Sequence, residues 1–288
     1  MTDPKSGAPG GVRQLSRLLS QAAKREAIPE SRLRGWLSAR VLSAALARSR
    51  DEDGQPLFLI RGGIAMELRL DMQARATQDF DAVIRDPVVD IEEAVRSALG
   101  DEWHGFTFTP TPPEPIRHSS AQRTLVQLDY RGQPWGKVKL EVAHAEGELG
   151  QEHSQVAVKA LPWARLPLPT EAACVSLRYV VAQKIHACTE PPRDDAIPNE
   201  RFRDVMDLLL IESEIRQSNP IEVRTACQEI FHLRGTHAWP PVLTAPESWE
   251  PGYATLCRDN GFEPSDVKVG VARVNLLIDW IAGDQHRA

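Results

Sequence analysis

Two carboxylates at the start of a short apolar run give this sequence its clearest chemical signal. Asp79 and Asp81 flank Phe80 and lead into residues 82–84, Ala-Val-Ile, which have the β-branched bias of a strand. Side chains two apart in a strand share a face and lie roughly 7 Å apart. These carboxylates therefore repel each other unless a cation lies between them. A hard divalent ion such as Mg²⁺ takes oxygen ligands and keeps positions open for phosphate, so the pair predicts a Mg²⁺ site.

A glycine pair precedes these acids by about one helix. Residues 57–60 form a short apolar run, Gly62 and Gly63 interrupt it, and apolar residues recur at helical spacing from Ile64 to Met72. We therefore predict a strand, a glycine turn and a helix. The free N–H groups and the positive dipole end at the start of such a helix can bind a polyphosphate.

A predicted β-hairpin, residues 123–130 and 137–143, offers a third carboxylate. In its second strand the even positions are apolar and the odd positions are charged, so Glu141 shares an exposed face with two lysines. We assign Glu141 as the third metal carboxylate. Asp129 on the partner strand is the competing candidate, and either acid could instead form a cross-strand salt bridge.

A lysine occurs on the apolar face of a later helix. We predict this helix from an N-cap at Thr170 to Thr189, and Lys184 falls on the same stripe as Val180 and Cys188. An unpaired ammonium group on an apolar face is costly. Either the side chain extends along its stem to solvent, or Lys184 binds the β- or γ-phosphate of a nucleotide as a point charge.

Charged residues also line a predicted helix over residues 200–211. Asp204 and Asp207 are three positions apart and share a helix face, and Arg203 is within reach of Asp207 at i,i+4. From their spacing, these residues can hold the helix in an Arg-Asp network.

The order of these motifs resembles that of the AbiEii/AbiGii-type nucleotidyltransferase toxins, a family that includes MenT-like toxins and belongs to the polymerase-β-like nucleotidyltransferase superfamily. The resemblance spans residues 58–211. It consists of a glycine pair before a helix, an Arg-x-Thr-x-Asp-x-Asp pattern, and a lysine helix followed by Arg-Asp-x-x-Asp. The matching residues are Gly62, Gly63, Arg75, Thr77, Asp79, Asp81, Lys184, Arg203, Asp204 and Asp207.

The resemblance implies an α/β (α+β) fold, in which a polymerase-β-like nucleotidyltransferase core with a mixed sheet is joined to a helical C-terminal lobe and the active site lies between them. It also implies Mg²⁺-dependent transfer of an NMP from an NTP to an acceptor hydroxyl. Asp79, Asp81 and Glu141 would hold Mg²⁺, and Glu141 would help to activate the hydroxyl. The family usually has Asp where this chain has Glu141, which shifts the carboxylate by roughly 1.5 Å.

The same resemblance assigns nucleotide binding to Gly62, Gly63, Lys184 and Arg203. It gives Lys184, Asp204 and Asp207 active-site roles. It further implies the toxin of a toxin–antitoxin pair, with a cognate antitoxin as partner and an RNA acceptor, which in some relatives is the 3′ end of tRNA.

Thr77 precedes Asp79 by two residues, and we expect it on the same side of the chain. Phosphorylation there would add about −1.5 to −2 charges beside two acids. Because an antitoxin can act by such a modification in related toxins, the resemblance makes Thr77 a regulatory candidate. The alternative is that Thr77 caps or braces the turn into the strand.

Composition narrows the class of protein. The chain has 288 residues, of which 42% are hydrophobic, with no apolar run near 18 residues and no signal-peptide pattern. We expect a cytoplasmic protein without membrane contact, whose four widely spaced cysteines are buried, reduced thiols.

Charge is distributed unevenly along the chain. The net charge is −6, but residues 1–50 hold ten Lys and Arg against three acids, a balance of +7 that leaves −13 for the remainder. The basic N-terminal part either binds RNA phosphates or is an ordinary solvated helix face.

The remaining pattern predicts the elements that position these residues. We expect a disordered tail at residues 1–10, a nucleotidyltransferase domain with basic N-terminal helices at 11–165, and a helical C-terminal domain at 166–288. Predicted helices cover residues 12–26, 31–49 with Ser31 as N-cap, 90–99, 220–233, 248–260 and 265–282, and a strand covers 105–109.

Two other functions fit parts of this pattern. A transferase with the same core could modify a small molecule or a protein hydroxyl, and it would not label RNA. A catalytically silent RNA-binding module would bind RNA equally well without NTP or Mg²⁺, but the complete set of carboxylates argues against it.

Overall fold

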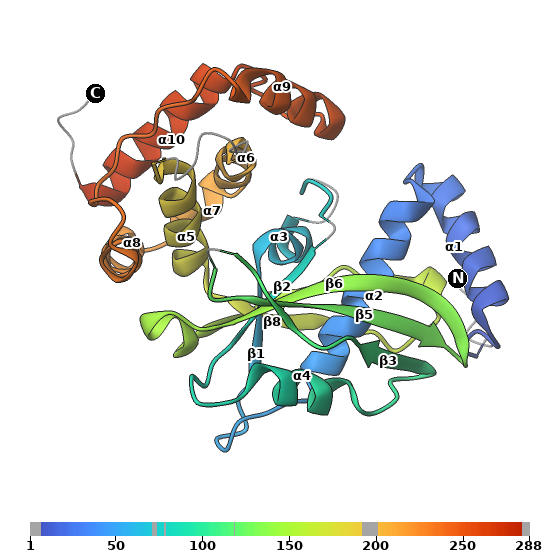
Figure 1. The fold of residues 1–288 in the computed structure, drawn as a ribbon. Coiled ribbons are helices and arrows are strands. Elements are labelled where there is room, and N and C mark those ends of the chain that lie inside the picture. Colours follow the sequence, from blue (N-terminus) through green and yellow to red (C-terminus); the bar gives the residue numbers. More distant parts are fainter. Residues whose placement is uncertain (1–6, 71–73, 78, 118, 192–200, 284–288) are drawn as a thin grey trace. The chain divides into compact units, whose positions relative to one another are not determined.

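The computed structural model describes residues 7–70, 74–77, 79–117, 119–191 and 201–283. The chain divides into two compact units, whose elements are labelled in Figure 1. Unit 1 comprises residues 1–71, 76–145 and 150–174, and unit 2 comprises residues 72–75, 146–149 and 175–288.

Unit 1 is built on a mixed sheet, which has eight strands among the described residues. The strand order is β3-β5-β6-β2-β1-β8-β7, with β4 paired to β5. Strands β3, β5, β6, β2, β1 and β8 are labelled in Figure 1. Strand β2 lies between β6, to which it is parallel, and β1, to which it is antiparallel. The strands are β1 (Phe58–Arg61), β2 (Asp79–Ile84), β3 (Phe106–Pro110), β4 (Glu114–Pro115), β5 (Gln122–Tyr130), β6 (Gln133–His144), β7 (His153–Ala157) and β8 (Glu171–Val175).

The described helices of unit 1 pack their apolar residues into the core of this sheet. They are α1 (Val12–Glu26), α2 (Glu30–Leu46), α3 (Gly62–Leu70) and α4 (Ile91–Leu99). Leu19, Leu37, Val95 and Leu140 belong to one hydrophobic cluster that joins α1, α2, α4 and β6. Helix α4 also has a local start signal, because the Asp90 side chain accepts a hydrogen bond of 2.9 Å from the backbone N–H of Glu93.

Unit 2 is helical in its described part. Its helices are α5 (Leu177–Thr189), α6 (Phe202–Leu210), α7 (Glu212–Gln217), α8 (Pro220–Arg234), α9 (Trp249–Asn260) and α10 (Val267–Ala282). Helix α8 has both end signals, since Asn219 caps its start, Pro220 is its first residue, and Gly235 ends it with a φ of 61°.

The mixed α/β fold and most of the predicted elements are confirmed. Helices α1, α4, α8, α9 and α10, strand β3 and the hairpin of β5 and β6 lie within a few residues of the predicted bounds. These elements have strong local patterns, which do not depend on a distant partner.

Two predicted helix starts are wrong. The segment after Thr170 is strand β8, and α5 begins at Leu177. Strand β8 pairs with β1 in parallel, Ile60 opposite Cys174, so a tertiary contact overrides the local helix signal. Helix α2 begins at Glu30 after Pro29 without a side-chain cap, one residue before the predicted N-cap Ser31.

Part of the predicted N-terminal tail, residues 1–6, lies outside the described residues. Pro9, within the rest of that tail, accepts a hydrogen bond of 2.7 Å from the buried hydroxyl of Tyr130. All four cysteines are buried free thiols, as predicted, and burial raises the pKa of Cys174 to about 12.

Candidate active site

The predicted metal carboxylates lie in neighbouring rows of the sheet in unit 1. Asp81 on β2 is opposite Glu141 on β6, and Asp79 is opposite Lys139. Asp79, Asp81 and Glu141 are each partly exposed, whereas their strand neighbours Phe80, Ala82, Leu140 and Val142 are buried. Because side chains alternate along a strand, the three carboxylates project from the same face of the sheet.

The glycine turn approaches this face closely. Gly62 has a φ of 65°, a left-handed conformation that favours glycine. A side chain at Gly62 would collide with the carboxylate of Asp81, and a Cβ at Gly63 would lie 2.7 Å from the Thr77 hydroxyl oxygen. The start of α3 therefore packs directly against the segment that carries the acids, and only glycine fits at the turn.

A buried carboxylate about one turn further along the helix also fixes this packing. Glu67 on α3 is 7% exposed, and its Oε1 accepts a hydrogen bond of 2.9 Å from the backbone N–H of Thr77. The Thr77 hydroxyl lies 3.5 Å from the carbonyl oxygen of Asp79. Thr77 thus braces the turn into β2, which is one of the two roles considered from the sequence.

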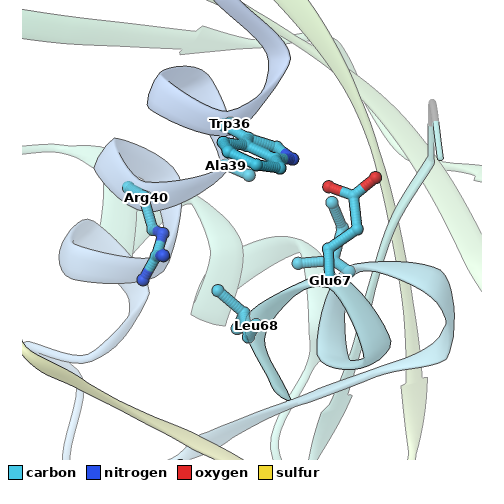
Figure 2. A pocket seen from close by; sticks show the side chains of 6 residues that line it. Trp36, Ala39, Arg40, Glu67 and Leu68 are labelled. Atoms are coloured by element: carbon cyan, nitrogen blue, oxygen red, sulfur yellow. The ribbon is translucent and has the colours of Figure 1, made fainter. Parts of the chain in front are cut away.

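A small cavity lies beside Glu67, between α2 and α3. Figure 2 shows Trp36 and Arg40 reaching toward it from α2, and Glu67 and Leu68 from α3. Its volume is about 10 Å³, roughly the space for the centre of one water molecule. This cavity is too small for a substrate, so the candidate site is the carboxylate face and not this pocket.

Asp79 and Glu141 each form an ion pair with a cation on the same face. The Nζ of Lys139 lies 3.3 Å from Oδ1 of Asp79. Arg123 on β5 donates two hydrogen bonds, of 2.9 and 2.6 Å, to Oε1 of Glu141. The cross-strand salt bridge considered from the sequence therefore forms at Glu141.

Asp129, the competing third carboxylate, lies elsewhere on the sheet. It is six residues from Arg123 along β5, roughly 20 Å in an extended strand. It accepts a hydrogen bond of 3.0 Å from the Gln127 side chain. The register therefore favours Glu141 as the neighbour of Asp81.

The donor set on this face fits a hard divalent ion. Its donors are carboxylate oxygens, and Oδ1 of Asp79 is a buried atom without a hydrogen-bond partner among the described residues. In the described part of the chain, no three His, Cys, Asp or Glu side chains are gathered closely enough to form a metal site as they stand. Glu141 is instead hydrogen-bonded to Arg123 through Oε1.

Unit 2 contains a second cluster of charged residues. Lys184 on α5 is 7% exposed, and its Nζ lies 3.0 Å from Oδ1 of Asp204 and 2.6 Å from Oδ2 of Asp207 on α6. Arg75 donates two hydrogen bonds of 3.2 Å to the two carboxylate oxygens of Asp207. Lys184 therefore does not extend to solvent, which excludes the first of its two predicted roles.

The charges of this cluster stabilise one another. Burial by itself would raise the pKa of Asp207, but attraction to Lys184 and Arg75 outweighs it and lowers that pKa. Burial would also lower the pKa of Lys184, yet attraction to Asp207 and Asp204 raises it. Both groups are therefore charged at neutral pH. Arg203 is exposed on α6, and Arg201 lies 3.5 Å from Asp204.

Four residues near these clusters were not assigned a role from the sequence. Arg75 binds an acid 132 positions away, which no local pattern could reveal. Lys139 and Arg123 could be found only by pairing the strands in register. Glu67 had a weak signal, as the one acidic residue in an otherwise apolar turn of helix.

A comparison with known proteins identifies the family. A family model described as "Nucleotidyl transferase AbiEii toxin, Type IV TA system" matches residues 44–273, which is most of the chain and includes both charged clusters. The chain belongs to the AbiEii nucleotidyltransferase toxin family. The prediction from the order of the motifs is thereby confirmed, and this AbiEii toxin is a nucleotidyltransferase of a type IV toxin–antitoxin system.

A solved structure supports the fold of this AbiEii toxin. MenT4, a nucleotidyltransferase toxin from Mycobacterium tuberculosis H37Rv, matches with a TM-score of 0.57 and 16% sequence identity, over 93% of this chain and 89% of that chain. At this identity the match shows a shared fold. The search of curated proteins gave no significant match. No helix in the described part of the AbiEii toxin is long and apolar enough to cross a membrane.

Proposed function

We propose that this toxin transfers an NMP from an NTP to a hydroxyl at the 3′ end of an RNA, with tRNA as the expected acceptor and Mg²⁺ as the cofactor. The observation that carries the proposal is the arrangement in unit 1, where Asp79, Asp81 and Glu141 share one face of the sheet beside the Gly62 turn. The tRNA acceptor comes from the family resemblance.

Each site residue of unit 1 has its own role in the proposed reaction. Asp79, Asp81 and Glu141 would hold Mg²⁺, which when bound neutralises charge on the reacting phosphate. The N–H groups at the start of α3 bind the triphosphate. Glu141 accepts the proton of the acceptor hydroxyl, whose oxygen forms a bond to the α-phosphorus as the bond to pyrophosphate breaks.

In unit 2, Lys184 is the proposed phosphate-binding cation, with Arg203 as a second nucleotide-binding residue. Asp204 and Asp207 position Lys184, since both bind its ammonium group. A buried lysine held by two acids keeps a defined direction, which a surface lysine does not.

The proposal is tested by incubating the purified toxin with total RNA and each labelled NTP in turn. We expect label on RNA from at least one NTP, and none from Asp79→Ala or Asp81→Ala at unchanged melting temperature. Transfer of label to a small molecule or protein alone would instead identify a different acceptor. Mg²⁺-dependent transfer that survives either substitution would refute the metal assignment.

Thr77 is also proposed as a control point, through which the cognate antitoxin could act by modification. Its side chain packs on Gly63, so a phosphoryl group would block the start of α3 and add negative charge beside Asp79. We expect Thr77→Glu to be inactive. Thr77→Ala should remain active and escape the antitoxin, and its ready neutralisation would exclude Thr77 as the control point.

A further inference from the structure

Two cations lie among the proposed metal carboxylates on the exposed face of the sheet. One row across the strands places Asp79 beside Lys139, and the next places Asp81 beside Glu141 and Arg123. The side chains of Lys139 and Arg123 are 49% and 48% exposed. Each cation is thus within reach of an acid and of solvent at the same time.

The contact of Lys139 with Asp79 is a weak one. The two groups are 3.3 Å apart, yet Oδ1 of Asp79 has no hydrogen-bond partner among the described residues. Asp79 is itself 43% exposed, and ion pairs between exposed groups contribute only about 0–1 kcal/mol. Another cation can therefore displace Lys139 at little cost.

The contact of Arg123 with Glu141 is stronger but incomplete. Both of its hydrogen bonds, from Nε and Nη2, end on Oε1 of Glu141, so the guanidinium does not span the carboxylate. Arg123 therefore leaves Oε2 of Glu141 outside its hydrogen bonds.

A divalent ion would compete with both cations. It needs the same oxygens of Asp79 and Glu141, and like charges gathered at one place repel. Once displaced, the ammonium and guanidinium groups require another anion close by. The anions that arrive at such a site are the phosphates of the substrate, and both side chains are long enough and sufficiently exposed to turn toward them.

We propose that Lys139 and Arg123 are exchangeable counter-ions, which bind Asp79 and Glu141 until a divalent ion replaces them and then bind a phosphate group of the substrate. This inference rests on the proposed function, because it takes these acids as metal ligands. It adds two phosphate-binding residues to the site and explains why the sheet places cations among acids that must bind Mg²⁺.

The chain offers a matched control on the same strand. Lys137 precedes Lys139 by two residues, so it projects from the same face of β6 and is likewise exposed. Its register partner is Gln127, and no carboxylate of a described residue forms an ion pair with it. Lys137→Met therefore removes the same charge from the same face without releasing an acid.

The first measurement is Mn²⁺ binding without nucleotide or RNA, by titration calorimetry or by the electron paramagnetic resonance signal of free Mn²⁺. We expect Lys139→Met to bind Mn²⁺ about two- to five-fold more tightly, the range given by an exposed ion pair. Lys137→Met should differ from the parent much less. Asp79→Asn should lose this binding, and if the parent shows no Asp79-dependent binding, the proposed function fails together with this inference.

The second measurement is phosphate binding in the presence of Mg²⁺, with two ligands tested separately. One is a non-hydrolysable nucleoside triphosphate and the other is a short single-stranded RNA. We expect Lys139→Met and Arg123→Met to weaken at least one of them several-fold more than Lys137→Met does, and the ligand affected identifies the source of the phosphate. Two results would overturn this inference and leave the proposed function standing. In the first, Mn²⁺ binding depends on Asp79 but is unchanged in Lys139→Met. In the second, Lys139→Met and Lys137→Met have equal effects on the binding of both ligands.

Discussion

At the residue scale, the chemistry of this toxin depends on how each acid is compensated. Asp79 has a weak lysine partner, Glu141 has an arginine bound to one oxygen, and Asp207 is enclosed by Lys184 and Arg75. The cations paired with Asp79 and Glu141 are about half exposed, so these two acids can exchange partners. Asp207 is 0% exposed and is bound to both Lys184 and Arg75, so it holds these two cations in fixed positions.

The two candidates for the third carboxylate can be separated by substitution. Glu141→Gln should lower the transfer rate by about 10²-fold or more, which is the contribution of a general base. Asp129→Asn serves as the control and should change the rate little, because Asp129 binds Gln127 at the other end of β5. Single-turnover transfer assays measure both variants, and the reverse ranking would mean that Asp129 is the catalytic acid.

The buried cluster of unit 2 should give stability a defined pH dependence. The pKa of Asp207 is lowered in the folded state, so its stabilising charge is present above its usual value of 3.8 and is lost as the pH falls through the lowered pKa. Lys184 has a raised pKa, so its contribution is lost only at pH above its usual 10.5. Between these limits the network is intact.

Asp207→Asn should therefore destabilise the protein by about 3–5 kcal/mol at pH 7, the range for breaking a buried ion pair. The difference from the parent should shrink in acid, because the parent loses the same charge there. Denaturant unfolding at pH 7 and in acid measures it. Glu212→Gln, which removes an acid paired with exposed Arg216 and Arg273, should have a smaller effect. If Asp207→Asn lowered the free energy of unfolding by the same amount at pH 7 and in acid, the proposed ionic network would be contradicted.

At the element scale, the position of α3 determines the geometry of the site. The helix starts at a glycine turn that only glycine can form, and its buried Glu67 holds the backbone of Thr77. These two contacts lie at different turns of the same helix, so together they orient β2 relative to the helix start. The acids are thus positioned by a helix that carries neither of them.

Substitution of Glu67 tests this coupling. Glu67→Ala leaves the partly buried N–H of Thr77 without its acceptor, which should cost about 1–3 kcal/mol of stability. Transfer activity should fall further than the loss of folded protein explains. Glu67→Gln keeps a side-chain oxygen and should restore most of both properties. Thermal melting and transfer rates are measured side by side, and a Glu67→Ala variant that melts early but transfers at the parental rate would show a purely structural role.

At the scale of the whole molecule, charge separates the N-terminal part from the rest of the chain. Residues 1–50 have a balance of +7 within a net charge of −6. Arg13, Arg17 and Lys24 are exposed on α1, whereas Arg25 pairs with Glu26 at 2.8 Å. The first three cations are therefore available to a polyanion.

Replacing Arg13, Arg17 and Lys24 together by Gln should weaken RNA binding and reduce its salt dependence. The slope of log affinity against log salt should fall by about 2, because each phosphate contact contributes roughly 0.7–0.9. Arg25→Gln is the control, and its effect should be smaller because Glu26, 2.8 Å away, offsets part of the attraction of Arg25 for a polyanion. RNA binding measured over a range of salt concentrations tests this, and an unchanged slope would assign these charges to solvent.

The sequence alone determined the features whose cause is local. The spacing of Asp79 and Asp81, the glycine turn, and the helix that follows Asp90 each depend on a few neighbouring residues, so the pattern predicts them directly. The order of these motifs also identified the family. Composition and periodicity were sufficient for most helices, because an apolar stripe records which face is buried.

Only the tertiary structure decided which distant groups meet. The segment of strand β8 was predicted from its local pattern as the first turn of a helix, but it pairs in parallel with β1. Asp207 lies 132 residues from the arginine that binds it. Likewise, the sequence was compatible with Glu141 as a free metal ligand or as a member of an ion pair. Only the register of β5 and β6 shows that Arg123 lies beside it. Side-chain periodicity shows the direction in which a residue projects, but the tertiary fold determines which residue it contacts. The reason is that the free energy of a buried charge comes from the groups that surround it.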